Sequence, residues 1–272
     1  MVTTLALLCI IFPEQNGDKS GEEQTAPYAE EELIAAPILS AEEQLQTFKL
    51  KQPYAIELVA SEPLVFDPVI AMWDEQQRLW VVEMTSYMRD ADGNNEDQAN
   101  CCVAVIIDSN DDGKLDQRIE YLNDLILPRG IVPVKEGMLV LAPPNLLLCE
   151  DLDGDWVADR RTIIKSGFEN AITVPEHAPN NMLRSIDNYI YLAKHNKRWQ
   201  WKDGQLIEDG YTSASQWGLT EDLYGRKFYN HNSYPLFFDK LPANYFAGKS
   251  FDFKRQALQQ AIATERPHPA RL

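Results

Sequence analysis

The chain has 272 residues, of which 44% are apolar and 10% aromatic, so it can fill the core of one large all-β domain or of two ordinary domains. Its formal net charge of −17 argues against nucleic-acid binding, because little is available to neutralise a phosphate backbone, and disfavours an anionic membrane surface. The four cysteines include no Cys-x-x-Cys pair, so the chain offers no zinc knuckle or c-type haem site.

The first twelve residues, MVTTLALLCIIF, are apolar but too few to span a bilayer. They resemble the apolar part of an export signal, although no Lys or Arg precedes them, and a frayed apolar terminus is the alternative. Residues 13–47 are rich in Glu, which predicts a disordered acidic leader or linker. We therefore expect an exported protein, periplasmic or membrane-anchored, whose folded part covers residues 48–272. Helical signals are confined to residues 41–48 and 255–263.

Four segments of the folded part share one pattern, in which a turn signal leads into a short aliphatic and aromatic run. The pattern predicts a hairpin turn that enters a buried strand. Its copies are residues 73–82, 134–141, 186–192 and 220–229. Short strands repeated at a spacing of about 40–50 residues indicate the blades of a β-propeller. The sequence therefore predicts an all-β protein, an incomplete β-propeller of about four blades, because closed propellers usually contain more.

One acidic loop occurs twice, at residues 108–116 and, 43 residues later, at residues 151–159. Each copy lies between two apolar runs that predict blade strands. Oxygen-bearing side chains fall at positions one, three, five and nine of both copies, and Ca²⁺ prefers several such hard oxygens on a flexible loop. The candidate ligands are Asp108, Asn110, Asp112, Asp116 and the carbonyl of Lys114 in the first loop, and Asp151, Asp153, Asp155 and Asp159 in the second.

The two loops differ at position six. Gly113 permits a sharp turn in the first loop, whereas Trp156 takes this place in the second, which predicts either strain or another loop shape. Neither loop has Glu at position twelve, so an EF-hand is excluded and a structural Ca²⁺ bound with an affinity of about 10⁻⁴–10⁻³ M is expected. The alternative is a pair of Asp/Asn turns that satisfy only their own backbone.

His177 is the histidine with a functional signal. It lies about ten residues before the turn residue Asp187 and opens the strand expected to line the central channel. An imidazole there can act as a general base near neutral pH, and the alternative is a turn histidine beside Pro179. His195 and His231 lie in Asn-containing turns and are expected to be hydrogen-bonded loop residues. The tryptophans are typical of blade packing, with carbohydrate stacking as the alternative for exposed ones: Trp73, Trp80, Trp199, Trp201 and Trp217.

Residues 177–191 read H-x₅-L-x₃-D-x₂-I-Y, and this pattern resembles that of soluble quinoprotein glucose/sorbosone dehydrogenases. The resemblance implies that His177 takes the proton of a substrate hydroxyl while pyrroloquinoline quinone accepts a hydride. Residues 61–84 and 215–236, together with the acidic loops, are similar to the Pirellula-type membrane-bound dehydrogenases. In that family an N-terminal β-propeller is often followed by a helical-repeat region and a C-terminal cytochrome c domain.

The leading hypothesis is therefore the propeller domain of an exported quinoprotein-like dehydrogenase that oxidises a sugar or polyol alcohol, with His177 as base and Ca²⁺ stiffening the blade loops. A cytochrome c would accept the electrons, with haem c in a C-terminal domain that these residues do not include, so the fragment alone is expected to be inactive. The alternative is a non-catalytic propeller that binds a glycan or a protein partner, because the fold hosts many functions.

Overall fold

The structure, a computed structural model, describes residues 37–90, 92–168, 175–210, 212, 215–231, 234–249 and 256–262. The expected export signal and most of the acidic leader lie outside these ranges. Helix α1 (Ala41–Thr47) occupies the end of the leader and begins with a capping box between Ser40 and Glu43, whose side chains each bond the other's backbone N–H. No helix within the described ranges is long and apolar enough to cross a membrane.

The strands of the described chain form four antiparallel sheets of four strands each, and a short 3₁₀ helix, η3 (Ala243–Phe246), lies between β15 and β16. Strands pair in chain order within every sheet, so each sheet is a meander, as in a propeller blade. Blade 1 contains β1 (Pro68–Trp73), β2 (Leu79–Glu83), β3 (Cys101–Ile107) and β4 (Gln117–Leu125). Blade 2 contains β5 (Gly130–Val134), β6 (Gly137–Ala142), β7 (Asn145–Glu150) and β8 (Arg160–Ser166). Blade 3 contains β9 (Asn180–Arg184), β10 (Ile190–Ala193), β11 (Arg198–Lys202) and β12 (Gln205–Asp209). Blade 4 contains β13 (Leu219–Glu221), β14 (Lys227–His231), β15 (Tyr234–Phe238) and β16 (Gln260–Ala261).

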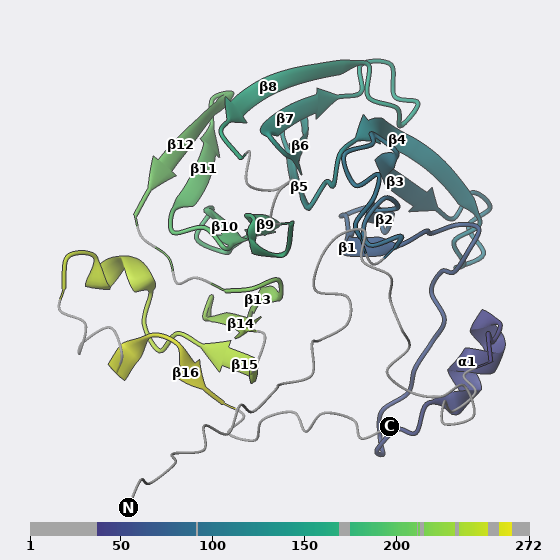
Figure 1. Ribbon diagram of the computed structural model, residues 1–272, viewed down its shortest axis with the longest axis horizontal. Coiled ribbons are helices and arrows are strands. Elements are labelled where there is room, and N and C mark those ends of the chain that lie inside the picture. The colour runs from purple at the N-terminus through teal and green to yellow at the C-terminus, as the bar shows by residue number, and fades with distance from the viewer. Residues whose placement is uncertain are drawn as a thin grey trace, which may run out of the picture.

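The blades follow one another around a common centre, with the first strand of each blade innermost, and they form an arc rather than a closed ring (Figure 1). This arrangement confirms the predicted all-β, incomplete β-propeller. The four turn-and-strand segments form the inner hairpins of the blades, and the acidic loops join β3 to β4 and β7 to β8, as predicted. The predicted helix over residues 255–263 is wrong at Gln260–Ala261, because these residues supply the outer strand of blade 4 and pair with β15.

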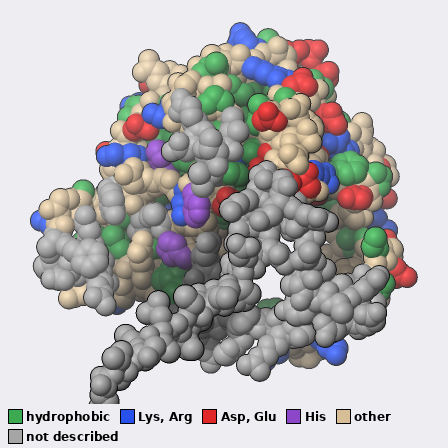
Figure 2. Space-filling view, viewed as in Figure 1, with side chains coloured by type: hydrophobic (Ala, Val, Ile, Leu, Met, Phe, Trp, Pro, Cys, Tyr) green, Lys and Arg blue, Asp and Glu red, His purple; other side chains and the backbone are tan. Residues whose placement is uncertain are grey.

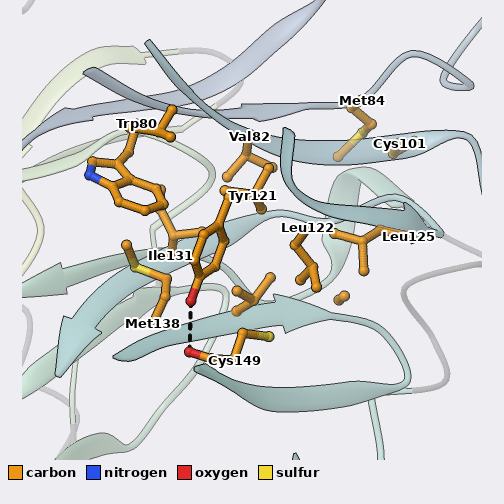
Figure 3. Packing of buried hydrophobic residues seen from close by; sticks show 14 of the residues in the cluster. Trp80, Val82, Met84, Cys101, Tyr121, Leu122, Leu125, Ile131, Met138 and Cys149 are labelled. Atoms are coloured by element: carbon orange, nitrogen blue, oxygen red, sulfur yellow. Dashed lines mark hydrogen bonds between the residues drawn. The ribbon is translucent and has the colours of Figure 1, made fainter. Parts of the chain in front are cut away.

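Successive side chains of a strand point to opposite faces of its sheet, so each blade contributes apolar side chains to the core on both of its sides. In β6, Met138 and Val140 belong to the apolar cluster shared with blade 1, whereas Leu139 and Leu141 belong to the cluster shared with blade 3. Figure 3 shows the cluster between blades 1 and 2, where the Tyr121 hydroxyl donates to the Cys149 carbonyl at 2.7 Å. This bond satisfies the one polar atom of a side chain that is otherwise packed in apolar surroundings.

The propeller has two faces that matter for function. The innermost strands all begin at one face, the top face, which carries the loops 84–100, 126–129, 175–179 and 215–218. They end at the bottom face, which carries the inner hairpin turns 74–78, 135–136, 185–189 and 222–226 and both acidic loops. His177 and the acidic loops therefore lie on opposite faces of the propeller, and the loops, which join the two outer strands of their blades, lie away from its centre.

Candidate functional site

His177 lies on the top face, at the end of the short 3₁₀ helix η2 (Pro175–His177) that leads into β9. Its side chain is exposed, whereas Pro175, Ala178 and Asn180 on either side of it are buried. The position is the predicted one, at the start of an innermost strand of the propeller. Side chains from other blades donate hydrogen bonds to the backbone of this turn, which sets it apart from an ordinary surface turn.

Three buried side chains hold the backbone carbonyls around His177. We call this set, Arg129, Asn180 and Gln216, the carbonyl clamp. Arg129 Nη1 donates to the carbonyl of residue 175 at 2.5 Å, and Gln216 Nε2 donates to the carbonyl of residue 176 at 3.1 Å. Asn180 Nδ2 donates to the carbonyl of residue 178 at 2.9 Å and to that of Gln216 at 3.1 Å.

The clamp draws on several blades. Arg129 precedes β5 of blade 2, Asn180 begins β9 of blade 3, and Gln216 precedes β13 of blade 4. Blade 1 contributes through the β2–β3 loop, where the Tyr87 hydroxyl donates to Glu176 Oε1 at 2.9 Å. Burial of the clamp is nearly complete, since Arg129 and Asn180 are 0% exposed and Gln216 is 8% exposed. The turn before β9 is thus fixed by all four blades.

Burial also shapes the electrostatics of this face. Desolvation lowers the pKa of Arg129 to about 10, although the neighbouring Tyr87 and Glu176 oppose the shift. Burial, reinforced by the bond to Glu176, raises the pKa of Tyr87 to about 12. The pKa of Glu176 is lowered by a backbone hydrogen bond and then by the Tyr87 hydroxyl. Near neutral pH the site therefore presents a guanidinium, a phenol and a carboxylate around the His177 turn.

Two further histidines lie at turns of the top face. Burial, followed by the nearby Lys194 ammonium, lowers the pKa of His231. Burial also lowers the pKa of His195, against the attraction of Glu208, whose carboxylate lies 3.8 Å from His195 Nε2. Histidine side chains gather on the face turned toward the viewer in Figure 2, over blades 3 and 4. His195 lies in the loop between β10 and β11, as expected, and its Nε2 atom is buried with no hydrogen bond of ordinary length among the described residues.

The acidic loops, by contrast, share one backbone conformation on the bottom face. In each loop, the residue at position six donates its N–H to the carboxylate at position one, at 2.7 Å for Gly113 and 3.0 Å for Trp156. The N–H of position two likewise bonds the carboxylate at position nine in both, and position seven bonds position five. The two loops are thus structural repeats, each satisfying much of its own backbone.

Positions four and six have positive φ in both loops. The first loop has Asp111 at +61° and Gly113 at +86°, and the second has Gly154 at +86° and Trp156 at +69°. The prediction of strain or another shape at Trp156 is thereby resolved: the loop keeps its shape, and Trp156 takes a left-handed conformation that disfavours a bulky side chain. The Arg78 guanidinium lies 3.6 Å from the centre of the Trp156 ring and fixes it.

Of the predicted metal ligands, the structure brings together Asp151, Asp153 and Asp159, whose carboxylate oxygens lie within 4.8 Å of one another. Within the described ranges these residues form the one such group of three acidic, His or Cys side chains. Asp155 instead accepts the N–H of Val157. In the first loop, Asn110 and Ser109 donate to Asp116, and Asp108 accepts three backbone N–H groups. The Lys114 N–H donates to Asp112 in the same turn.

Like charges repel one another in the second loop. A hydrogen bond from the Asp155 N–H lowers the pKa of Asp153, but the combined repulsion of three neighbouring carboxylates outweighs it and raises that pKa above its ordinary value. A bound cation would relieve this repulsion. The arrangement is thus chemically suited to a hard divalent ion, with most backbone groups of the loop already satisfied.

Sequence reasoning indicated that His177 precedes an innermost strand but did not identify the residues that support the turn. Arg129, Asn180, Gln216 and Tyr87 come from loops separated by tens of residues, and no local pattern links them. The Asn180–Asn181 pair at the start of β9 is the nearest signal, since consecutive amides are unusual at the start of a buried strand.

The chain is similar in structure to a gluconolactonase from Xanthomonas campestris, with 14% identity and a TM-score of 0.44 over 64% of this chain and 57% of that one. It is also similar to the holo form of the PQQ domain of a pyranose dehydrogenase from Coprinopsis cinerea, with 15% identity and a TM-score of 0.41 over 68% and 51%. The matched part thus spans a little over half of each of these chains. No curated protein matches the sequence. The family model described as a domain of unknown function, DUF7133, matches residues 40–271, and the chain therefore belongs to this family.

Proposed function

We propose that the top face carries the active site of a dehydrogenase that oxidises a sugar or polyol alcohol, with His177 as the general base. The carbonyl clamp is the observation that carries this proposal. Buried side chains from three blades fix the backbone on either side of one exposed imidazole. A surface histidine without a role needs no such support, whereas a base must stay within hydrogen-bond reach of the proton it removes.

The resemblance to quinoprotein dehydrogenases makes pyrroloquinoline quinone the proposed hydride acceptor. This cofactor is a planar tricarboxylate, so its site needs fixed positive charge. The top face supplies the buried guanidinium of Arg129 beneath the His177 turn and the ammonium of Lys194, which already acts on His231. These residues fit an anionic cofactor, with Lys194 as the contact and Arg129 as a fixed background charge. When bound, the quinone would supply the hydride acceptor that no side chain provides.

In this proposal the chain's own residues handle the proton. A neutral His177 imidazole takes the proton of the substrate hydroxyl, and the clamp keeps the ring from moving away as the bond lengthens. The Glu176 carboxylate, which accepts the Tyr87 hydroxyl, is adjacent to His177 in the chain and places a fixed negative charge next to the base. A cytochrome c, in the same protein or as a partner, would then receive the electrons.

We further propose that Ca²⁺ occupies the second acidic loop through Asp151, Asp153 and Asp159, and the first loop through Asp108, Asn110, Asp112, Asp116 and the Lys114 carbonyl. The close carboxylates and the raised pKa of Asp153 support the second loop most directly. Sites with an affinity of about 10⁻⁴–10⁻³ M fill in calcium-rich extracellular surroundings. The calcium proposal therefore goes together with export to the periplasm or to a membrane anchor.

The test uses the protein at its full genomic length, loaded with pyrroloquinoline quinone and Ca²⁺, with dye reduction measured over a panel of aldoses and polyols. The wild type should reduce the dye, and His177→Gln should lower the rate by about 10²–10⁴-fold while quinone binding, followed by tryptophan fluorescence, persists. His195→Gln, a histidine packed against Trp199 away from the clamp, serves as the matched control. A wild type that reduces no dye with any substrate, or a His177→Gln variant with the wild-type rate, would rule out the proposal.

A further inference from the structure

We infer that a groove on the bottom face binds a neutral carbohydrate chain. The groove has a volume of about 680 Å³ and opens where β1, β5 and β9 end, with Trp73, Val134 and Arg184 in its lining. From there it runs outward between blades 1 and 2 to Trp156 of the second acidic loop. Its volume lies within the range of small-molecule sites, about 300–1,000 Å³. Nothing in this inference depends on His177, which lies at the other end of the channel.

Trp73 is the first reason to consider a sugar. As the last residue of β1, it was predicted to pack within a blade, but its side chain is 52% exposed. Trp80 and Trp199 follow the prediction and are 5% and 0% exposed. A single exposed apolar residue is ordinary, but an indole exposed within a concave groove is available for stacking. The C–H face of a pyranose ring packs well on such a surface.

Two charged side chains in the lining, Glu136 and Arg184, are each held by one hydrogen bond to the protein and keep other polar atoms available for a ligand. Glu136 Oε2 accepts the indole N–H of Trp201 at 2.7 Å, and Arg184 Nη2 donates to the Pro133 carbonyl at 2.7 Å. Glu136 Oε1 and the remaining Arg184 nitrogens have no hydrogen-bond partner among the described residues. A side chain already fixed through one atom loses less freedom when another atom binds a ligand. One acceptor and several donors suit hydroxyl groups, which both donate and accept.

Trp156 forms the far wall of the groove and is held in a strained backbone conformation. Trp156 takes a left-handed conformation where the first loop has Gly113, and the Arg78 guanidinium covers one face of its ring at 3.6 Å. Asp74 in turn holds Arg78 through an ion pair of 2.6 Å. Bulky residues persist in such conformations where the surroundings over-determine them, often at ligand sites. The indole also packs against the apolar cluster between blades 1 and 2, so both its inner edge and the face under Arg78 are fixed.

The charge around the groove selects a neutral ligand. Its lining includes carboxylates and cations in similar number, Glu75, Glu136 and Asp151 against Lys135 and Arg184, in addition to the paired Asp74 and Arg78. A polyanion would also be repelled by the net charge of −17. A neutral oligosaccharide is not repelled by the net charge, and its hydroxyl groups can bond both the carboxylates and the cationic side chains of the lining.

Maltotetraose and cellotetraose are the probes for the test, with binding to the full chain measured by tryptophan fluorescence and by saturation-transfer NMR. At least one probe should bind saturably, and Trp73→Ala should weaken it by about tenfold, which is 1.4 kcal/mol. Trp73→Phe should retain most of the affinity, because a smaller aromatic face remains. Glu136→Gln and Arg184→Gln should each weaken binding several-fold.

The matched control is Tyr224→Ala, which removes an aromatic side chain that is 82% exposed on the same face but outside this groove. It should bind the probe as the wild type does, and urea unfolding should show that all variants remain folded. Three results would overturn the inference: no binding of either tetrasaccharide, equal binding by Trp73→Ala, or tighter binding of a sulfated oligosaccharide than of its neutral counterpart.

Discussion

Asn180→Asp tests the carbonyl clamp by changing the chemistry of one buried side chain without changing its shape. Asn180 is 0% exposed, and its Nδ2 donates to the carbonyls of Ala178 and Gln216. Its Oδ1 has no hydrogen-bond partner among the residues that the structure describes. Aspartate would place a carboxylate oxygen where the amide nitrogen stands. The carbonyl oxygens of Ala178 and Gln216 would then face another acceptor instead of a donor.

The expected cost follows from these contacts. Two lost hydrogen bonds contribute about 1 kcal/mol each, and an unsatisfied buried group costs about 1–3 kcal/mol more. The free energy of unfolding should therefore fall by about 3–5 kcal/mol, a large part of the 5–15 kcal/mol typical of a domain. The buried carboxyl should have a folded pKa above its unfolded value, so the variant is least destabilised below the ordinary pKa of Asp and loses stability as pH rises.

Urea unfolding followed by tryptophan fluorescence at about pH 5 and about pH 8 measures both effects. Asn145→Asp is the control, because Asn145 uses its Oδ1 as an acceptor from Ser166 Oγ at 2.7 Å and aspartate preserves that bond. The control should change the free energy of unfolding by no more than about 0.5 kcal/mol. If Asn180→Asp costs no more than the control, or becomes more stable as pH rises, the clamp does not hold the turn as described.

Two other predictions concern the proposed metal site on the bottom face and a histidine of the top face. In a chelator, Asp153→Asn should raise the melting temperature, because it removes the repulsion that raises the pKa of this carboxyl. In Ca²⁺ it should lower the melting temperature, because a ligand of the ion is lost. A shift of the same sign in both conditions would mean that the loop is only a turn. Burial and Lys194 depress the pKa of His231, so its neutral form contributes stability above the ordinary value of 6.5, and this contribution is lost as pH falls through the depressed pKa. His231→Gln should therefore reduce the decline in unfolding free energy between about pH 7 and about pH 5, and urea titrations with an unchanged slope would contradict this reasoning.

The parts of the fold that sequence could predict are those encoded by local patterns. Turn residues followed by apolar runs indicated all four inner hairpins, since Asp74 and Asp222 each accept two backbone N–H groups of their own turn. The acidic loops were found because their oxygen spacing is local as well. The short strand β16 was missed because it exists only through its pairing with β15.

The parts that could not be predicted depend on which surfaces meet. Trp80 and Trp73 lie in adjacent strands of one hairpin and have the same blade-packing signal, yet one is buried and the other half-exposed. The register pairs Trp73 with Leu79 and Trp80 with Met72, so the two indoles lie on opposite faces of the sheet, and the Trp80 face is the one that packs against blade 2. The same limit applies to Arg129, whose partner carbonyl is 46 residues away and leaves no trace in either local sequence.

If Ca²⁺ occupies the acidic loops and His177 is the base, as proposed, the separation of the two faces determines how the ion affects the activity. The acidic loops are linked to the top face only through the blades, for example by the apolar cluster that joins Trp156 to Tyr121 and Ile131 between blades 1 and 2. The His177 turn is held from the top by side chains of its own face. Removal of calcium should therefore lower the stability of the blades before it moves the base. Calcium-dependent activity in this protein would then follow the fraction of folded molecules rather than a change in the rate of the chemical step.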